Sequence, residues 1–177
     1  MSDKTGIAWT EATWNPTTGC AKVSQGCKHC YAECDWARLS SIPGTAYTGR
    51  DFTDVQCHEE RLTVPLRWKR PRKIFVNSMS DLFHEKVPDQ FIDQVFAVTA
   101  VCRRHTFQVL TKRPERMQSY LMDEYVHDRI IAHAITSARL LDDCDGQTTV
   151  AAVLVATNYA GDVLDGRVWH DYPPAST

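Results

Sequence analysis

Three cysteines are spaced closely enough to bind a metal centre from a single loop. Cys20, Cys27 and Cys30 follow the pattern Cys-x6-Cys-x2-Cys, and the aromatic Tyr31 comes directly after the third cysteine. Three thiolates from one loop suit a cubane cluster of four irons and four sulfides, whose fourth iron stays open for a substrate or cofactor. The spacing therefore favours a four-iron four-sulfur cluster.

A structural zinc ion and unliganded core thiols are the alternatives. Zinc needs a fourth donor to complete a tetrahedron, and the candidates are His29, Cys34, Cys57 and His58. His29 lies between two of the cysteines and is poorly placed to bind the same metal, whereas Cys34 lies one helical turn beyond Cys30. Seven cysteines without an apolar N-terminal signal region indicate a reducing compartment, so we expect the cytoplasm.

A second set of chemically capable residues follows the two strands that we predict in the middle of the chain. Asn77, Ser78, Ser80 and Asp81 come at the end of the first, and Lys112 with Arg113 comes at the end of the second. Parallel α/β folds place ligands at the carboxyl edge of their strands, so we expect these groups to share one site. The competing interpretation is a capped loop in which the side chain of Ser80 or Asp81 accepts hydrogen bonds from backbone N–H groups.

A strongly basic segment precedes the first of these strands. Residues 61–116 carry 12 basic and 5 acidic side chains, in a chain whose net charge is −2. The densest run is Arg67, Trp68, Lys69, Arg70, Pro71, Arg72 and Lys73. Cations interleaved with an aromatic ring are typical of nucleic-acid or phosphate contact, to which Lys112 and Arg113 would add from the same side. The alternative is a solvated loop with Trp68 packed on the core.

The elements that must position these residues alternate between strands and helices. We predict an extended segment over 7–18, strands over 73–78, 106–111 and 148–156, and helices over 30–42, 88–104, 114–121 and 125–143. This order predicts a single α/β domain over 1–177, with a parallel sheet and the cysteine loop after the first strand. No apolar run reaches 18 residues, so we expect no membrane association.

Several motifs occur in the order found in a known family. They are Gly6–Cys20 with Gly26–Glu33 around the cysteines, Pro71–His84, and Val109–Met117. Together they resemble a phage-associated family of three-cysteine proteins that has no settled function and is similar to radical S-adenosylmethionine enzymes.

The resemblance implies a four-iron cluster on Cys20, Cys27 and Cys30, and S-adenosylmethionine bound through its amino and carboxylate groups at the open iron. One electron would cleave the sulfonium bond to give a 5′-deoxyadenosyl radical, which is chemistry of the cofactor. Tyr31 would lie near the adenine, and the remaining cofactor-binding residues would be Asn77, Ser78, Ser80 and Asp81. The cellular setting would be the cytoplasm of a bacterial host.

The resemblance covers roughly residues 5–122 and implies a partial, TIM-barrel-like parallel sheet of about four strands. Residues 1–122 would form this radical-SAM-like half-barrel, and 123–177 would be a divergent C-terminal part. Only residues 164–170 resemble the family's closing segment, so the chain looks internally shortened. We therefore expect a non-catalytic or partner-dependent protein that binds a host protein or nucleic acid through residues 123–160. The alternatives are an active radical S-adenosylmethionine enzyme that modifies a nucleic acid or nucleotide, and a zinc-stabilised nucleic-acid-binding module. Whether the chain is an enzyme stays open.

Overall fold

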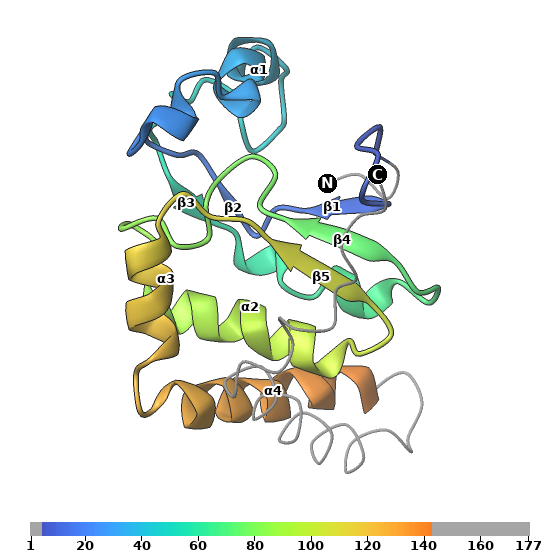
Figure 1. Ribbon diagram of the computed structural model, residues 1–177. Helices are drawn as coiled ribbons and strands as arrows, with labels where there is room; N and C mark the ends of the chain where they lie inside the picture. The colour runs from blue at the N-terminus through green and yellow to red at the C-terminus, as the bar shows by residue number, and fades with distance from the viewer. Residues whose placement is uncertain (1–4, 143–177) are drawn as a thin grey trace, which may run out of the picture.

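A parallel sheet of three strands forms the centre of this computed structural model, which describes residues 5–142 (Figure 1). The strands are β1 (Ala12–Trp14), β4 (Lys73–Val76) and β5 (Thr106–Val109), in the order β1-β4-β5. Ala12 pairs with Ile74, and Lys73 pairs with Thr106. The predicted α/β class with a partial parallel sheet is confirmed. The strand expected over 148–156 lies outside the described residues.

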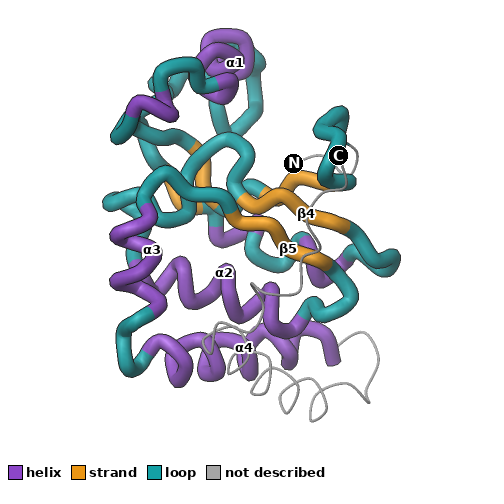
Figure 2. Tube along the Cα trace, viewed as in Figure 1, coloured by secondary structure: helices purple, strands orange, loops and turns teal. Residues whose placement is uncertain are grey.

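Four α-helices accompany the sheet within the described residues (Figure 2). They are α1 (Tyr31–Ser40), α2 (Asp89–Val101), α3 (Pro114–Leu121) and α4 (Val126–Asp142). Helices α2 and α4 pack against each other on one side of the sheet, while α1 and the cysteine loop lie on the other side. Each helix begins and ends within a few residues of its prediction. Prolines mark the starts of α2 and α3, and α4 has a long apolar period.

A small antiparallel sheet pairs the end of the predicted extended segment 7–18 with a segment for which no strand was predicted. Strands β2 (Thr17–Thr18) and β3 (Gln56–Cys57) pair through Thr17 with Cys57 and Thr18 with Gln56. Short 3-10 helices occur at Gln25–Cys27, Glu59–Arg61 and Pro65–Arg67. The predicted extended segment contains β2, but β3 is only two residues long and cannot carry an alternating pattern, so its pairing with β2 was not predicted.

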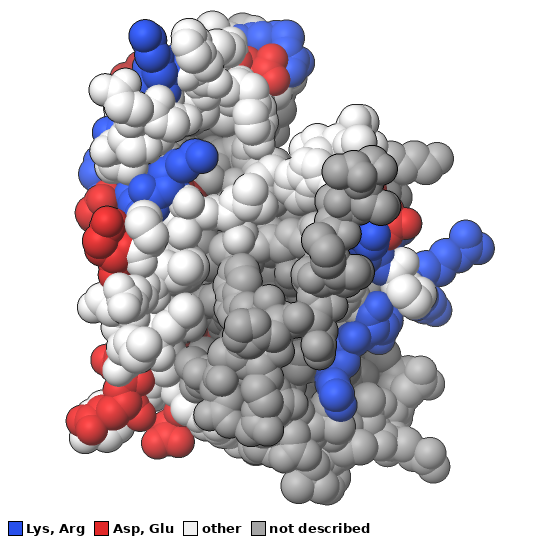
Figure 3. Space-filling view, viewed as in Figure 1, with Lys and Arg blue, Asp and Glu red and all other residues white. Residues whose placement is uncertain are grey.

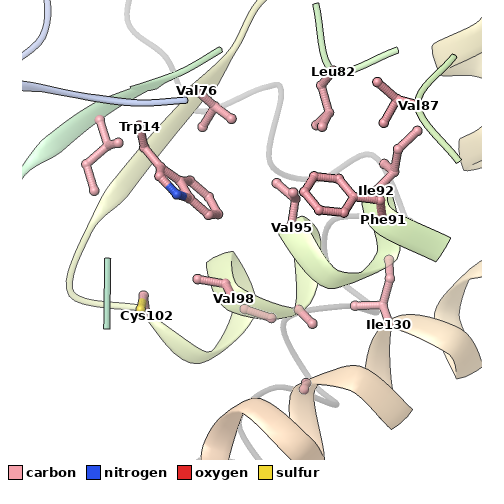
Figure 4. Close-up of a cluster of buried hydrophobic side chains, with 14 of the residues drawn as sticks. Trp14, Val76, Leu82, Val87, Phe91, Ile92, Val95, Val98, Cys102 and Ile130 are labelled. Carbon is pink, nitrogen blue, oxygen red and sulfur yellow. The ribbon is translucent and has the colours of Figure 1, made fainter. Parts of the chain in front are cut away.

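The hydrophobic core lies between the sheet and α2 (Figure 4). Trp14 and Val76 point from the sheet toward Ile92 and Val95 of α2, and Ile130 of α4 closes the far side. The indole of Trp14 is fully buried, and its Nε1–H donates to the carbonyl of Arg61 at 2.8 Å. Burying side chains of this size stabilises the fold by about 1.5–3 kcal/mol each.

A buried carboxylate joins the three helices on this side. Asp93 of α2 is 0% exposed, and its two oxygens accept from the Tyr120 hydroxyl at 2.7 Å and from Arg129 Nε at 2.9 Å. The same guanidinium reaches Asp123 at the surface, with Nη1 to Oδ1 at 2.8 Å. Burial and the Asp93 carboxylate raise the pKa of Tyr120, which keeps its hydroxyl a donor. Helix α4 is thus fixed to α2 by polar contacts as well as by apolar packing.

None of the helices that the structure describes is long and apolar enough to cross a lipid bilayer.

Asp93→Ala is expected to lower the free energy of unfolding by about 2–3 kcal/mol, because it leaves the Tyr120 hydroxyl buried without an acceptor and removes a partner of Arg129. Urea unfolding followed by circular dichroism measures this loss. Asp123→Ala is the matched control, since it removes the exposed partner of the same arginine and should cost far less. Equal losses in the two variants would contradict the structural role given to Asp93.

Candidate functional site

One cavity of about 590 Å³ lies at the carboxyl edge of β4 and β5, beneath α1 and the cysteine loop. Its lining includes all three cysteines of the motif together with residues that follow both strands. The predicted site residues that line it are Cys20, Cys27, Cys30, Tyr31, Asn77, Ser78, Ser80, Asp81, Lys112 and Arg113. Groups separated by more than 90 positions in the sequence therefore meet at one place, as the parallel order of the strands requires.

The cysteine loop leaves the small sheet through a glycine that no other residue can replace without strain. Gly19 has a φ of 88°, and a Cβ atom there would lie 2.3 Å from the backbone oxygen of Asp54. The adjoining backbone is held on both sides, since Gly19 N donates to Met79 O at 3.2 Å and Cys20 N donates to Phe52 O at 2.8 Å. Further on, Cys27 ends a 3-10 turn and Cys30 caps α1. This geometry turns the loop back toward the strand ends.

Arg113 ties the cysteine loop to the end of β5. Its Nη2 donates to Ala21 O at 3.1 Å, and its Nη1 lies 3.6 Å from the Cys20 sulfur. The same side chain pairs with Asp81 at 3.2 Å and Glu85 at 3.0 Å. Arg113 is only 4% exposed and is held by these partners, and the phosphate contact expected for it stays a prediction. Its role is to position the loop.

Asp81 and Ser80 are used mainly to hold the loop after β4. Asp81 accepts from the backbone N–H groups of Phe83 and Lys112 at 3.0 and 2.9 Å, and from the Thr111 hydroxyl at 2.8 Å. The Ser80 hydroxyl donates to Thr17 O at 2.9 Å. The contacts of Asp81 are those of the capped-loop interpretation, whereas Ser80 donates to a carbonyl. Both residues line the cavity, but their polar atoms already have partners within the described chain.

Asn77 leaves one polar group of the cavity wall without a partner. Its φ of 59° places it in the left-handed region, and its Oδ1 accepts from Thr17 N at 3.3 Å. The side-chain Nδ2 has no hydrogen-bond partner among the described residues, although Asn77 is only 2% exposed. Such a buried, unpaired donor is uncommon and marks a place where a bound group can accept a hydrogen bond.

Tyr31 links the start of α1 to the end of β4. Its hydroxyl donates to the backbone oxygen of Ser78, whose own Oγ donates to Asn15 Oδ1 at 3.1 Å. The ring is about half exposed and lines the cavity. The sequence predicted this residue next to the cofactor, and the structure brings it to the same cavity as the cysteines.

An aromatic wall that the sequence reasoning did not identify completes the cavity. Trp9 and Phe75 line it with their ring centroids 4.7 Å apart. Phe75 alternates along β4 with Ile74 and Val76, which point into the core, so it must face the opposite side of the sheet. This alternation was the signal in the sequence that could have placed Phe75 at the site.

The thiols differ in their surroundings. Burial raises the pKa of Cys20, and the neighbouring Arg113 offsets part of that effect. Burial also acts to raise the pKa of Cys27, but hydrogen bonds with Val23 and Ser24 outweigh it and lower the pKa. The Ser24 hydroxyl lies 3.6 Å from the Cys27 sulfur. Cys27 therefore becomes a thiolate more readily than Cys20.

No group of three or more His, Cys, Asp or Glu side chains in residues 5–142 lies close enough to hold a single metal ion. Two of the candidate fourth ligands are engaged elsewhere. His58 is buried with its Nε2 2.8 Å from the Thr18 hydroxyl, and Cys57 packs against the core. Cys34 is exposed, and His29 alone among the four lines the cavity. The described residues thus do not form a tetrahedral zinc site.

The basic segment lies at the opposite edge of the sheet from the cavity. Arg67–Lys73 lead into the amino end of β4, whereas Lys112 follows the carboxyl end of β5. The expectation that these cations share one side is wrong, because parallel strands place their starts at one edge and their ends at the other. Lys and Arg side chains gather on the flank where the chain enters β4 (Figure 3).

Trp68 packs against the core, with the Arg72 guanidinium 5.1 Å from its ring centroid.

A family model described as "Protein of unknown function (DUF5131)" matches residues 4–138. The chain belongs to the DUF5131 family. The match spans the cysteine loop and both strand ends that line the cavity, so these features lie in the part that the chain shares with DUF5131 proteins. No curated protein and no solved structure matches the chain.

Gly19→Ala is expected to lower the free energy of unfolding by about 3 kcal/mol, because it combines an unfavourable φ with a clash against backbone. Gly44→Ala is the control: its φ of 74° is similar, but nothing lies within 4 Å of the added carbon, so about 1 kcal/mol is expected. Urea unfolding compares the two variants. Equal losses would mean that the close approach to Asp54 does not fix the loop.

Proposed function

We propose that this chain is an iron–sulfur protein of the radical S-adenosylmethionine type. In this proposal Cys20, Cys27 and Cys30 bind a four-iron four-sulfur cluster, and the adjoining cavity binds S-adenosylmethionine. The observation that carries the proposal is the convergence of the three cysteines with Tyr31 and Asn77 on one cavity at the carboxyl edge of a parallel sheet. This edge is where α/β folds bind ligands.

The chemistry of the donor set fits a cluster better than a single ion. Each thiolate of a cubane site binds a different iron, so the three sulfurs need to surround a cavity rather than meet at one point. A single zinc ion would need four donors at about 2.0–2.3 Å, and the described residues do not assemble such a set. The three cysteines line one cavity, and this arrangement supports a cluster more than a single zinc ion.

The chain's own residues supply the rest of a nucleoside site. Trp9, Phe75 and Tyr31 offer aromatic surface for a flat base, and the unpaired Nδ2 of Asn77 can donate to an oxygen or ring nitrogen of the ligand. Arg113 holds the backbone beside Cys20, and its charge stabilises anionic sulfur there. When bound, the cluster would supply one electron to the sulfonium group of the cofactor.

We further propose that turnover depends on a macromolecular partner, either a host protein or a nucleic acid. Within the described residues β1 and β5 each pair only with β4, so these three strands leave both flanks of the sheet without a strand neighbour. Unpaired strand edges invite pairing with another chain. Radical chemistry also needs a closed site that excludes side reactions. An enzyme active on its own is the competing proposal.

Chain reconstituted anaerobically with iron and sulfide is expected to bind about four irons and to show the broad visible absorption of a cluster. Cys20→Ala, Cys27→Ala and Cys30→Ala should each abolish that absorption, since each removes one of three ligands. Cys57→Ala and Cys102→Ala are the controls and should retain it, because neither residue lines the cavity. Colourless protein that binds one zinc would contradict the proposal.

Addition of S-adenosylmethionine should change the electron paramagnetic resonance spectrum of the reduced cluster, while the isolated chain forms little 5′-deoxyadenosine. Asn77→Ala is expected to weaken the spectral response without loss of iron, because it removes a donor and not a ligand. Cys34→Ser decides whether the exposed cysteine contributes a fourth ligand. Many turnovers by the monomer alone would overturn the dependence on a partner and leave cofactor binding in place.

A further inference from the structure

Two segments far apart in the sequence form one cationic surface at the amino edge of the sheet. The first is the loop before β4, and the second is the turn between α2 and β5. Arg104 in that turn donates from Nε to Trp68 O at 2.8 Å and from Nη2 to Leu66 O at 2.9 Å, which fixes the two segments side by side. We call this the amino-edge surface; its exposed cations are Arg67, Lys69, Arg70, Lys73, Arg103 and Arg104.

Most of these charges are not neutralised within the part of the chain that the structure describes. The side chains of Arg67, Lys69, Arg70, Lys73 and Arg103 form no ion pair with a carboxylate of residues 5–142. The carboxylate of Glu11 lies beside this surface, where it accepts from the backbone N–H of Lys73 at 2.7 Å. A surface with this excess of positive charge attracts a polyanion.

An exposed aromatic ring lies between this surface and the cavity. Lys73 and Phe75 lie on the same face of β4, because side chains two residues apart in a strand point the same way. Trp9 packs on Phe75, lines the cavity and is 43% exposed. The backbone beside Trp9 is anchored to the same strand, since the Thr10 hydroxyl donates to Lys73 O at 2.9 Å. Cations, aromatic ring and cavity thus follow one another along β4.

We propose that this face binds single-stranded nucleic acid, with the backbone on the amino-edge surface and a base stacked on Trp9 at the mouth of the cavity. Single-strand binders combine a row of cations along the backbone with aromatic rings on which bases stack. Trp68 does not serve as that ring, because Arg72 lies over it and it packs against the core. The large apolar side chains exposed among the described residues all lie outside the amino-edge surface, which disfavours insertion into a lipid surface.

Fluorescence anisotropy with the full chain and a labelled single-stranded oligonucleotide tests the proposal. Affinity should fall by about 10²-fold between about 50 and about 200 mM salt if five phosphates are contacted. The double variant Lys69→Glu with Arg70→Glu should weaken binding at least about tenfold. It should also reduce the slope of log affinity against log salt concentration by the amount expected for about two phosphate contacts. Arg38→Glu with Lys86→Glu makes the same charge change away from this face and should have little effect.

Trp9→Ala separates stacking from charge. It should weaken single-strand binding by about tenfold with an unchanged salt dependence, because stacking involves no counterion release. Tyr125→Ala, which removes another exposed aromatic ring, is the matched control, and Trp9→Phe should restore much of the affinity. Circular dichroism checks that each variant is folded.

Three outcomes would overturn the inference: no binding at low salt, tighter binding to a duplex of the same sequence, or tighter binding to anionic lipid vesicles. The inference stands independently of the cluster, because the amino-edge cations and Trp9 bind no metal in the proposed function. Cys27→Ala should therefore keep its affinity for the oligonucleotide while losing its iron. Loss of both together would mean that the nucleic-acid surface forms only in the cluster-loaded chain.

Discussion

A carboxylate and a guanidinium meet where β4 and β5 end, with Asp81 Oδ2 3.2 Å from Arg113 Nη1 and both side chains buried. Burying two charges carries a desolvation cost that a single contact rarely offsets. Here the two groups also make further hydrogen bonds. Asp81 accepts from two backbone N–H groups and a hydroxyl, and Arg113 donates to Glu85 and to Ala21 O. The pair therefore fixes three pieces of backbone relative to one another. These are the ends of the two strands and the start of the cysteine loop.

The position of the cysteine loop depends on this pair more than on apolar packing. The 3-10 turn that ends at Cys27 has no buried residue, and Cys20, Cys27 and Cys30 are each partly exposed. Polar contacts are directional, so they can hold a loop at one orientation where a small apolar contact would let it slide. The glycine at position 19 sets where the loop starts, and Arg113 sets where it goes next. In the proposed function these contacts would keep the three thiols around one cavity before a cluster binds.

The elements of this fold that have a long apolar period could be predicted from the sequence, and the contacts between distant polar groups could not. Helix α2 buries Phe91, Ile92, Val95 and Val98 at helical spacing, and this pattern is visible without a structure. Lys112 and Arg113 look alike in the sequence, yet one is exposed and the other is buried, because the partners of Arg113 come from the loop after β4. Arg103 and Arg104 were likewise missed, since only the register of β4 with β5 brings them beside Arg67–Lys73.

The four residues of β4 set the distance between the proposed nucleic-acid-binding surface and the proposed cofactor cavity. From Lys73 at the amino edge to Asn77 at the cavity the backbone advances about 13 Å, at about 3.3 Å per residue. A stacked strand advances about 3.4 Å per nucleotide along its axis, so this span corresponds to about four nucleotides of a stacked strand. A strand bound at the amino edge would reach Trp9 after a few nucleotides and present its next base to the cavity. A partner bound in this way would cover the mouth of the cavity and so supply the closure that the proposed radical chemistry requires.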